Sequence, residues 1–75
     1  MSDVQGVSLE VGDRPINLTQ VLKLSGSVLS GGEAKALIAE GRVRVNGQVE
    51  LRKRKQMAVG DLVELDGGPS VRLTE

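Results

Sequence analysis

Basic side chains are concentrated in one stretch of this 75-residue sequence, between Lys35 and Lys55. The stretch holds seven cations and two acids, a formal net charge of +5, and because the whole chain is neutral the remaining residues carry −5. Cations that neutralise phosphates gain affinity by releasing condensed counterions, and a cationic face attracts polyanions even when the total charge cancels. The candidate binding residues are therefore Lys35, Arg42, Arg44, Arg52, Lys53, Arg54 and Lys55.

Several residue types are missing, and their absence limits other chemistry. The chain contains no cysteine, histidine, phenylalanine, tyrosine or tryptophan. Without cysteine or histidine, neither a nucleophile paired with a base nor a Cys/His metal site is available, so we expect no enzyme activity, no metal and no cofactor. Without aromatic side chains, unpaired bases cannot stack on the protein in the usual way, which favours recognition of nucleic-acid shape over base sequence.

Two helices are predicted before the last strands. Asn17 can cap a first helix that ends near Gly26 and has one apolar face, formed by Leu18, Val21 and Leu22. Ser30 and Glu33 have the spacing of a capping box, in which Glu33 reaches back to the amide of Ser30. They predict a second helix over about 31 to 40, ended by Gly41, with an apolar face of Ala34, Leu37 and Ile38.

Short strands account for the rest of the sequence. Alternation of apolar and polar residues predicts strands at 7–11, 43–45, 49–51, 62–65 and 70–74, with Val71 and Leu73 inward. We expect a three-residue loop, 46 to 48, because that register places Val43 and Val45 opposite Leu51 and Val49 on one buried face. Arg44 then points outward with no acid opposite it. The fold class is α+β, with two short helices packed on a small, mainly antiparallel sheet in a single domain, 1–75.

The residues from Ser30 to Gly47, SGGEAKALIAEGRVRVNG, are followed by the basic run 52–55 and then by Val-Gly-Asp at 59–61. This order resembles the S4-like RNA-binding domain, or alpha-L motif, over about residues 16–66, and in particular the stand-alone bacterial proteins of the YbcJ type. The resemblance implies that the N- and C-terminal strands complete the sheet and that the second helix and the following hairpin face structured RNA, with ribosomal RNA as a candidate target. Gly31 and Gly32 stand where family members often carry a basic residue. Further possible phosphate contacts are Ser30, Gly31 and Asn46.

Other interpretations of these features remain open. Residues 52–55 could be a solvated loop, and Asn46 a turn residue alone. A small protein-interaction module of the sulfur-carrier, β-grasp kind is an alternative, although Gly67-Gly68 is followed by seven more residues; DNA binding through the helices is another. Met1-Ser2-Asp3 begins no leader and no stretch is long and apolar enough to span a bilayer, so we expect a cytoplasmic monomer that makes no membrane contact.

Overall fold

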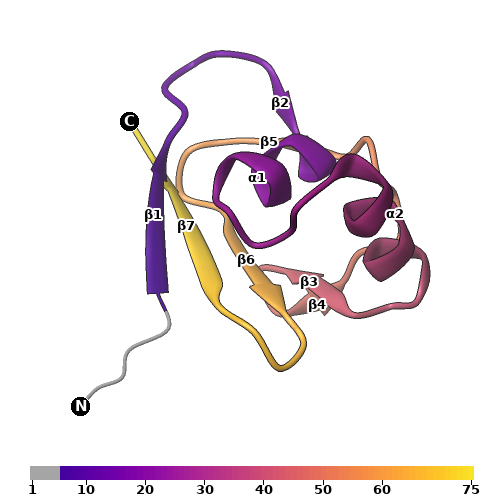
Figure 1. The fold of residues 1–75 in the computed structure, drawn as a ribbon. Coiled ribbons are helices and arrows are strands. Elements are labelled where there is room, and N and C mark those ends of the chain that lie inside the picture. The colour runs from indigo at the N-terminus through magenta and orange to yellow at the C-terminus, as the bar shows by residue number, and fades with distance from the viewer. Residues whose placement is uncertain (1–5) are drawn as a thin grey trace.

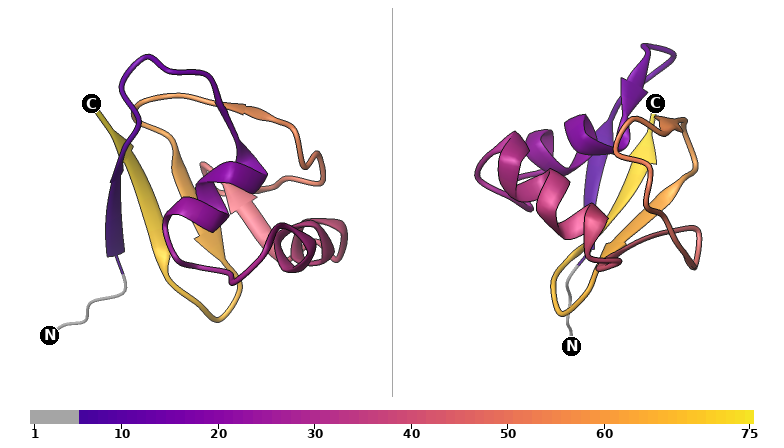
Figure 2. Two further views of the ribbon diagram at one scale, coloured as in Figure 1. Left: turned by 45° about the horizontal axis from the view of Figure 1, so that its top comes forward. Right: turned by 90° about the vertical axis from the view of Figure 1, so that its right-hand side faces the viewer.

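The computed structural model describes residues 6–75, so the expectation about Met1–Asp3 lies outside the described residues. Two helices lie on one face of a five-stranded sheet (Figures 1 and 2). In chain order the elements are β1 (Gly6–Glu10), β2 (Ile16–Asn17), α1 (Leu18–Leu24), α2 (Gly31–Ala39), β3 (Val43–Val45), β4 (Gln48–Val49), β5 (Gln56–Met57), β6 (Leu62–Leu65) and β7 (Ser70–Thr74). No helix within residues 6–75 combines the length and the apolar character that crossing a bilayer requires.

The sheet has the strand order β1-β7-β6-β3-β4 and is antiparallel except where β1 pairs with β7. The predicted class, two helices on a mainly antiparallel sheet, is confirmed. An aliphatic core fills the space between the layers, as the lack of aromatic residues requires. Its most deeply buried side chains are Leu18, Leu22, Ile38, Leu73, Val11, Val21, Val43, Val63 and Val71. The predicted inward residues Val45, Val71 and Leu73 are buried, while Leu37 is half-buried at the edge of the core.

Side-chain caps fix the starts of both helices. Asn17 accepts from the Gln20 amide at 2.9 Å and the Gln20 side chain accepts from the Asn17 amide, a complete capping box. At α2, Ser30 Oγ accepts from the Glu33 amide at 3.1 Å, as predicted. The second bond of the predicted capping box, from the Ser30 amide to Glu33, is wrong. Glu33 Oε1 accepts instead from the amide of the preceding residue, Leu29, at 2.8 Å.

The turn between β3 and β4 differs from the sequence-based expectation. Val45 pairs with Gln48 and Arg44 with Val49, so the loop is the two-residue Asn46-Gly47 turn. Both residues have positive φ, 53° and 87°, the backbone geometry of the tight hairpin turn for which Asn-Gly is best suited. The preference of Asn-Gly for a two-residue turn therefore determines the strand register, and the alternation of apolar residues does not. Val49 and Leu51 are 54% and 62% exposed and were wrongly placed in the core.

Two short strands, β2 and β5, were not predicted. They pair antiparallel, Ile16 with Met57 and Asn17 with Gln56, as a separate two-stranded sheet. Each has only two residues, too few to show an alternating pattern. Their pairing fixes the segment after the basic run against the start of α1.

Candidate functional site

Residues Arg52–Lys55, here called the basic loop, are anchored to the amino end of α1. The amide of Leu18 donates to the Lys55 carbonyl at 3.0 Å, and the amide of Thr19 donates to the Lys53 carbonyl at 3.2 Å. The Thr19 hydroxyl donates to the same Lys53 oxygen at 2.8 Å. The first N–H groups of a helix have no partner inside the helix, so these carbonyls satisfy them while the loop gains a fixed path.

Four cations surround a cavity of about 200 Å³ between the two helices and the basic loop. They are Lys23 of α1, Lys35 of α2, and Lys53 and Arg54 of the basic loop; we call them the basic cluster. The other lining residues are Asn17, Thr19, Gln20 and Gly31, so no acid lines this cavity. None of the four cations forms an ion pair with another residue in the part of the chain that the structure describes. The cluster is thus a local concentration of positive charge that the protein leaves uncompensated.

Gly31, at the amino end of α2, lies at the wall of the same cavity. A Cβ at this position would lie 3.6 Å from the Lys23 side chain, so the stem of Lys23 passes directly over the first turn of α2. The positive end of the α2 dipole therefore faces the side of the molecule that carries the basic cluster. Ser30, the helix cap, is exposed beside it.

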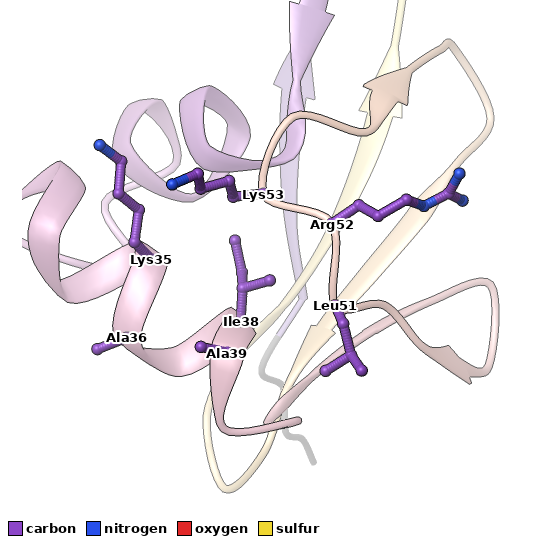
Figure 3. Close-up of a pocket in the computed structure, with 7 residues that line it drawn as sticks. All are labelled: Lys35, Ala36, Ile38, Ala39, Leu51, Arg52 and Lys53. Atoms are coloured by element: carbon purple, nitrogen blue, oxygen red, sulfur yellow. The ribbon is translucent and has the colours of Figure 1, made fainter.

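A second, larger cavity of about 630 Å³ adjoins the basic cluster. We call it the apolar cleft; it is lined by Lys35, Ala36, Ile38, Ala39, Leu51, Arg52 and Lys53 (Figure 3). Lys35 and Lys53 line both cavities, so the two cavities are neighbours. In Figure 3 the Lys35 and Lys53 side chains extend toward the same side, whereas the Arg52 side chain extends away from them.

Arg52 is engaged by Glu50. Arg52 Nε donates to Glu50 Oε2 at 2.8 Å, Arg52 Nη2 donates to Oε1 at 3.3 Å, and the Arg52 amide also donates to Oε2, at 3.0 Å. The side-chain and backbone hydrogen bonds from Arg52 lower the pKa of Glu50 from 4.5 to about 2. The same carboxylate raises the pKa of Arg52, so the pair stays ionised across the neutral range. One of the seven predicted cations is thus partly neutralised within the fold.

Arg42 and Arg44 line neither of these cavities. Arg42 Nε lies 3.1 Å from Glu40 Oε1, an ion pair in which both side chains are more than half exposed. Arg44 is exposed, as expected, but its cross-strand neighbour on β6 is Glu64, so the expectation of no opposing acid is wrong. Lys55 is half-buried and lines neither cavity.

Both ends of the Asn46 side-chain amide form hydrogen bonds within the protein. Its Nδ2 donates to Asp61 Oδ1 at 3.1 Å and its Oδ1 accepts from the Leu62 amide at 2.9 Å. These bonds tie the β3–β4 turn to the start of β6. Asn46 lines neither the cavity at the basic cluster nor the apolar cleft.

Lys23 is the one member of the basic cluster that sequence reasoning did not single out. It lies outside the basic stretch, in the last turn of α1, where a cation is ordinarily explained by the helix dipole. Only the packing of α1 against α2 brings it to Gly31.

Comparisons with known proteins agree with this architecture. The family model described as "S4 domain" matches residues 9–73. The Escherichia coli K12 protein named "Putative RNA-binding protein YbcJ" is 43% identical over 61 residues, which cover 80% of this chain and 87% of that protein. The Bacillus subtilis protein named "Probable ribosome maturation protein RlbA" is 37% identical over 59 residues, covering 79% of this chain and 83% of that protein.

A solution structure of YbcJ from E. coli, described as revealing an alpha-L motif involved in RNA binding, superposes with a TM-score of 0.66. It is 40% identical, and the match covers 100% of this chain and 92% of that one. The helix pair and the small sheet described above are therefore the alpha-L arrangement, as predicted. The chain belongs to the S4 domain family.

Proposed function

We propose that this protein binds structured RNA, with ribosomal RNA as the foremost target, through the basic cluster and the neighbouring basic loop. The observation that carries the proposal is the cavity lined by Lys23, Lys35, Lys53 and Arg54 with no acid among its lining residues. Four uncompensated cations on three segments form an array that can neutralise neighbouring phosphates and release their counterions.

The relatives support the same target class. One is named for RNA binding and another for ribosome maturation, and both match about four fifths of this chain. Among the predicted residues we assign the main phosphate contacts to Lys35, Lys53 and Arg54 and add Lys23. Arg42, Arg44, Arg52 and Lys55 are assigned peripheral contacts, because the first three face acids and Lys55 is half-buried.

We also propose that the protein acts in the cytoplasm as a monomeric binding module without catalytic activity. The S4 family membership supports a binding role, and the ribosome-related name of one relative supports the cytoplasm. The β-grasp, sulfur-carrier alternative is disfavoured by the position of the Gly-Gly pair. Gly67-Gly68 lies in the turn between β6 and β7, followed by the buried residues Val71 and Leu73.

The test is the salt dependence of binding to a folded ribosomal RNA fragment, measured by fluorescence anisotropy with labelled RNA. The double variant Lys35→Gln, Lys53→Gln should lose affinity by about tenfold or more. The slope of log affinity against log salt concentration should become shallower by about two, roughly one for each lost phosphate contact.

The matched control is Arg14→Gln, Arg72→Gln, which changes the net charge equally. These arginines bond to backbone carbonyls of Glu10, Val11 and Gly60, away from both cavities. The control should keep most of the affinity. Equal losses in the two double variants would show that binding depends on net charge alone and would contradict the assigned surface.

A further inference from the structure

We propose that the apolar cleft receives the base of a nucleotide extruded from the RNA, so that the protein prefers helices interrupted by an unpaired nucleotide. This inference rests on the proposed function, because it assumes that the RNA backbone lies on the basic cluster. It adds a ligand class that the charges alone do not specify.

The cleft offers apolar surface that the fold does not cover. Ala36 and Ala39 are exposed on successive turns of α2, and buried Ile38 lies between them. Across the cleft stands Leu51, whose side chain is 62% exposed because the tight Asn46-Gly47 turn directs it away from the core. The volume of about 630 Å³ lies in the range of small-molecule sites. Apolar surface left exposed in a concavity is a feature of binding sites.

The cations at the cleft determine which apolar group fits. Lys35 and Lys53 line both the cleft and the basic cluster, and their side chains extend toward the same side in Figure 3. A phosphate held between them therefore places its own nucleotide at the mouth of the cleft. An extruded nucleotide presents an apolar base face and a phosphate together, which is the combination that this surface complements.

RNA geometry explains why the base must leave its helix. In an uninterrupted A-form helix the bases are stacked and the major groove is too deep and narrow for side chains to reach them. Extruding a paired base costs a few kcal/mol, and an already unpaired nucleotide avoids most of that cost. Because the protein has no aromatic residue, the base would be held by burial against aliphatic side chains.

The experiment compares two hairpin RNAs with the same stem, one fully paired and one with a single-nucleotide bulge. We expect the bulged hairpin to bind about tenfold more tightly to the unaltered protein, a ratio that corresponds to roughly 1.4 kcal/mol. The variant Ala39→Leu narrows the cleft without changing charge. It should bring the bulged hairpin down to the affinity of the paired one and leave the paired hairpin unaffected.

Ala36→Leu gives an independent test should Ala39→Leu disturb folding, which circular dichroism would reveal. A fluorescent 2-aminopurine at the bulge reports the environment of the base directly, and the protein has no tryptophan to interfere. Its emission should change on binding to the unaltered protein and should change much less with Ala39→Leu.

The outcomes separate the two proposals. Equal affinity for both hairpins, or a 2-aminopurine signal that binding leaves unaltered, would overturn the extruded-base inference while the proposed function stands. A bulge preference that survives both Ala39→Leu and Ala36→Leu would also overturn it. Failure to bind either hairpin would count against RNA binding itself.

Discussion

Glu50 and Arg52 lie two residues apart and hold each other through three hydrogen bonds, one of them from the Arg52 backbone amide. The Glu50 side chain is only 12% exposed, whereas that of Arg52 is 74% exposed. The carboxylate is thus held by its partner at the start of the basic loop, and its charge compensates part of the loop.

This pair should give protein stability a specific acid dependence. The pKa of Glu50 is about 2 in the folded protein, against 4.5 as its ordinary value. The unfolded chain therefore binds more protons between these values, and the stability from this carboxylate is fully present above pH 4.5 and lost as the pH falls toward 2. Glu50→Gln should remove this part of the acid destabilisation, about 1 kcal/mol or less for a solvent-screened pair.

The measurement is urea unfolding followed by far-ultraviolet circular dichroism at several pH values from 2 to 6. The control is Asp13→Asn, since Asp13 is exposed and forms no ion pair with another residue of the range 6–75. It should leave the difference between pH 5 and pH 2.5 nearly unchanged. An identical acid response of Glu50→Gln and the unaltered protein would refute the prediction.

Thr19→Val should weaken RNA binding without removing any charge. The substitution deletes the hydroxyl that donates to the Lys53 carbonyl at 2.8 Å, so the basic loop becomes less firmly held. We expect a loss of about 1 kcal/mol in stability and a several-fold loss of affinity. The salt dependence should be unchanged, because every cation is still present.

Thr74→Val is the matched control for this effect. Its hydroxyl donates to the Leu9 carbonyl at 3.4 Å, between β7 and β1, away from the basic loop. RNA affinity should be unaffected in this variant. If Thr19→Val bound RNA as tightly as the unaltered protein, the hydrogen bond from the Thr19 hydroxyl to Lys53 would have no part in recognition.

Asn46→Ala should lower stability and leave the RNA affinity of the folded protein unchanged. The substitution removes the bonds to Asp61 and Leu62 and places alanine at a φ of 53°, which alanine adopts at a cost. We expect a loss of about 2 to 3 kcal/mol in the free energy of unfolding. Gln48→Ala, at an exposed neighbouring position, should cost far less. A selective loss of RNA affinity at unchanged stability would instead show that Asn46 contacts phosphate.

Leu51→Ala and Val43→Ala should differ sharply in stability because of the hairpin register. Val43 is fully buried and its truncation should cost about 2 kcal/mol or more, whereas Leu51 is mostly exposed and should cost less than about 1 kcal/mol. Urea unfolding of the two variants measures the difference. Comparable losses would favour the three-residue loop that the apolar pattern predicts.

The elements with strong local signals could be predicted from the sequence. Asn17 and Ser30 cap the helices where expected, and α2 ends at Ala39, two residues before Gly41, whose φ of +76° suits the reversal after a helix. The resemblance carried by residues 30–47 led to the correct family, because capping, helix termination and turn residues occur there in a fixed order.

Features that depend on contacts between distant segments could not be predicted. Lys23 and Gly31 come together only through the packing of α1 on α2, and the basic loop is placed by bonds to Thr19. The register of β3 and β4 was mistaken because the alternation of Val43, Val45, Val49 and Leu51 outweighed the strong preference of Asn-Gly for a two-residue turn. The exposed Leu51 that results is one of the residues that line the apolar cleft.

The bond between Thr19 and Lys53 spans 34 residues of sequence, and it makes the recognition surface a property of the whole folded chain. A peptide that carries only the basic loop has the same charges without their arrangement. RNA that binds the native state alone must therefore stabilise it, by about 2.7 kcal/mol when the free RNA is at a hundred times its dissociation constant. Resistance to thermal denaturation and to proteolysis of the unfolded chain would then keep rising with the logarithm of the free RNA concentration, even after almost every binding site is filled.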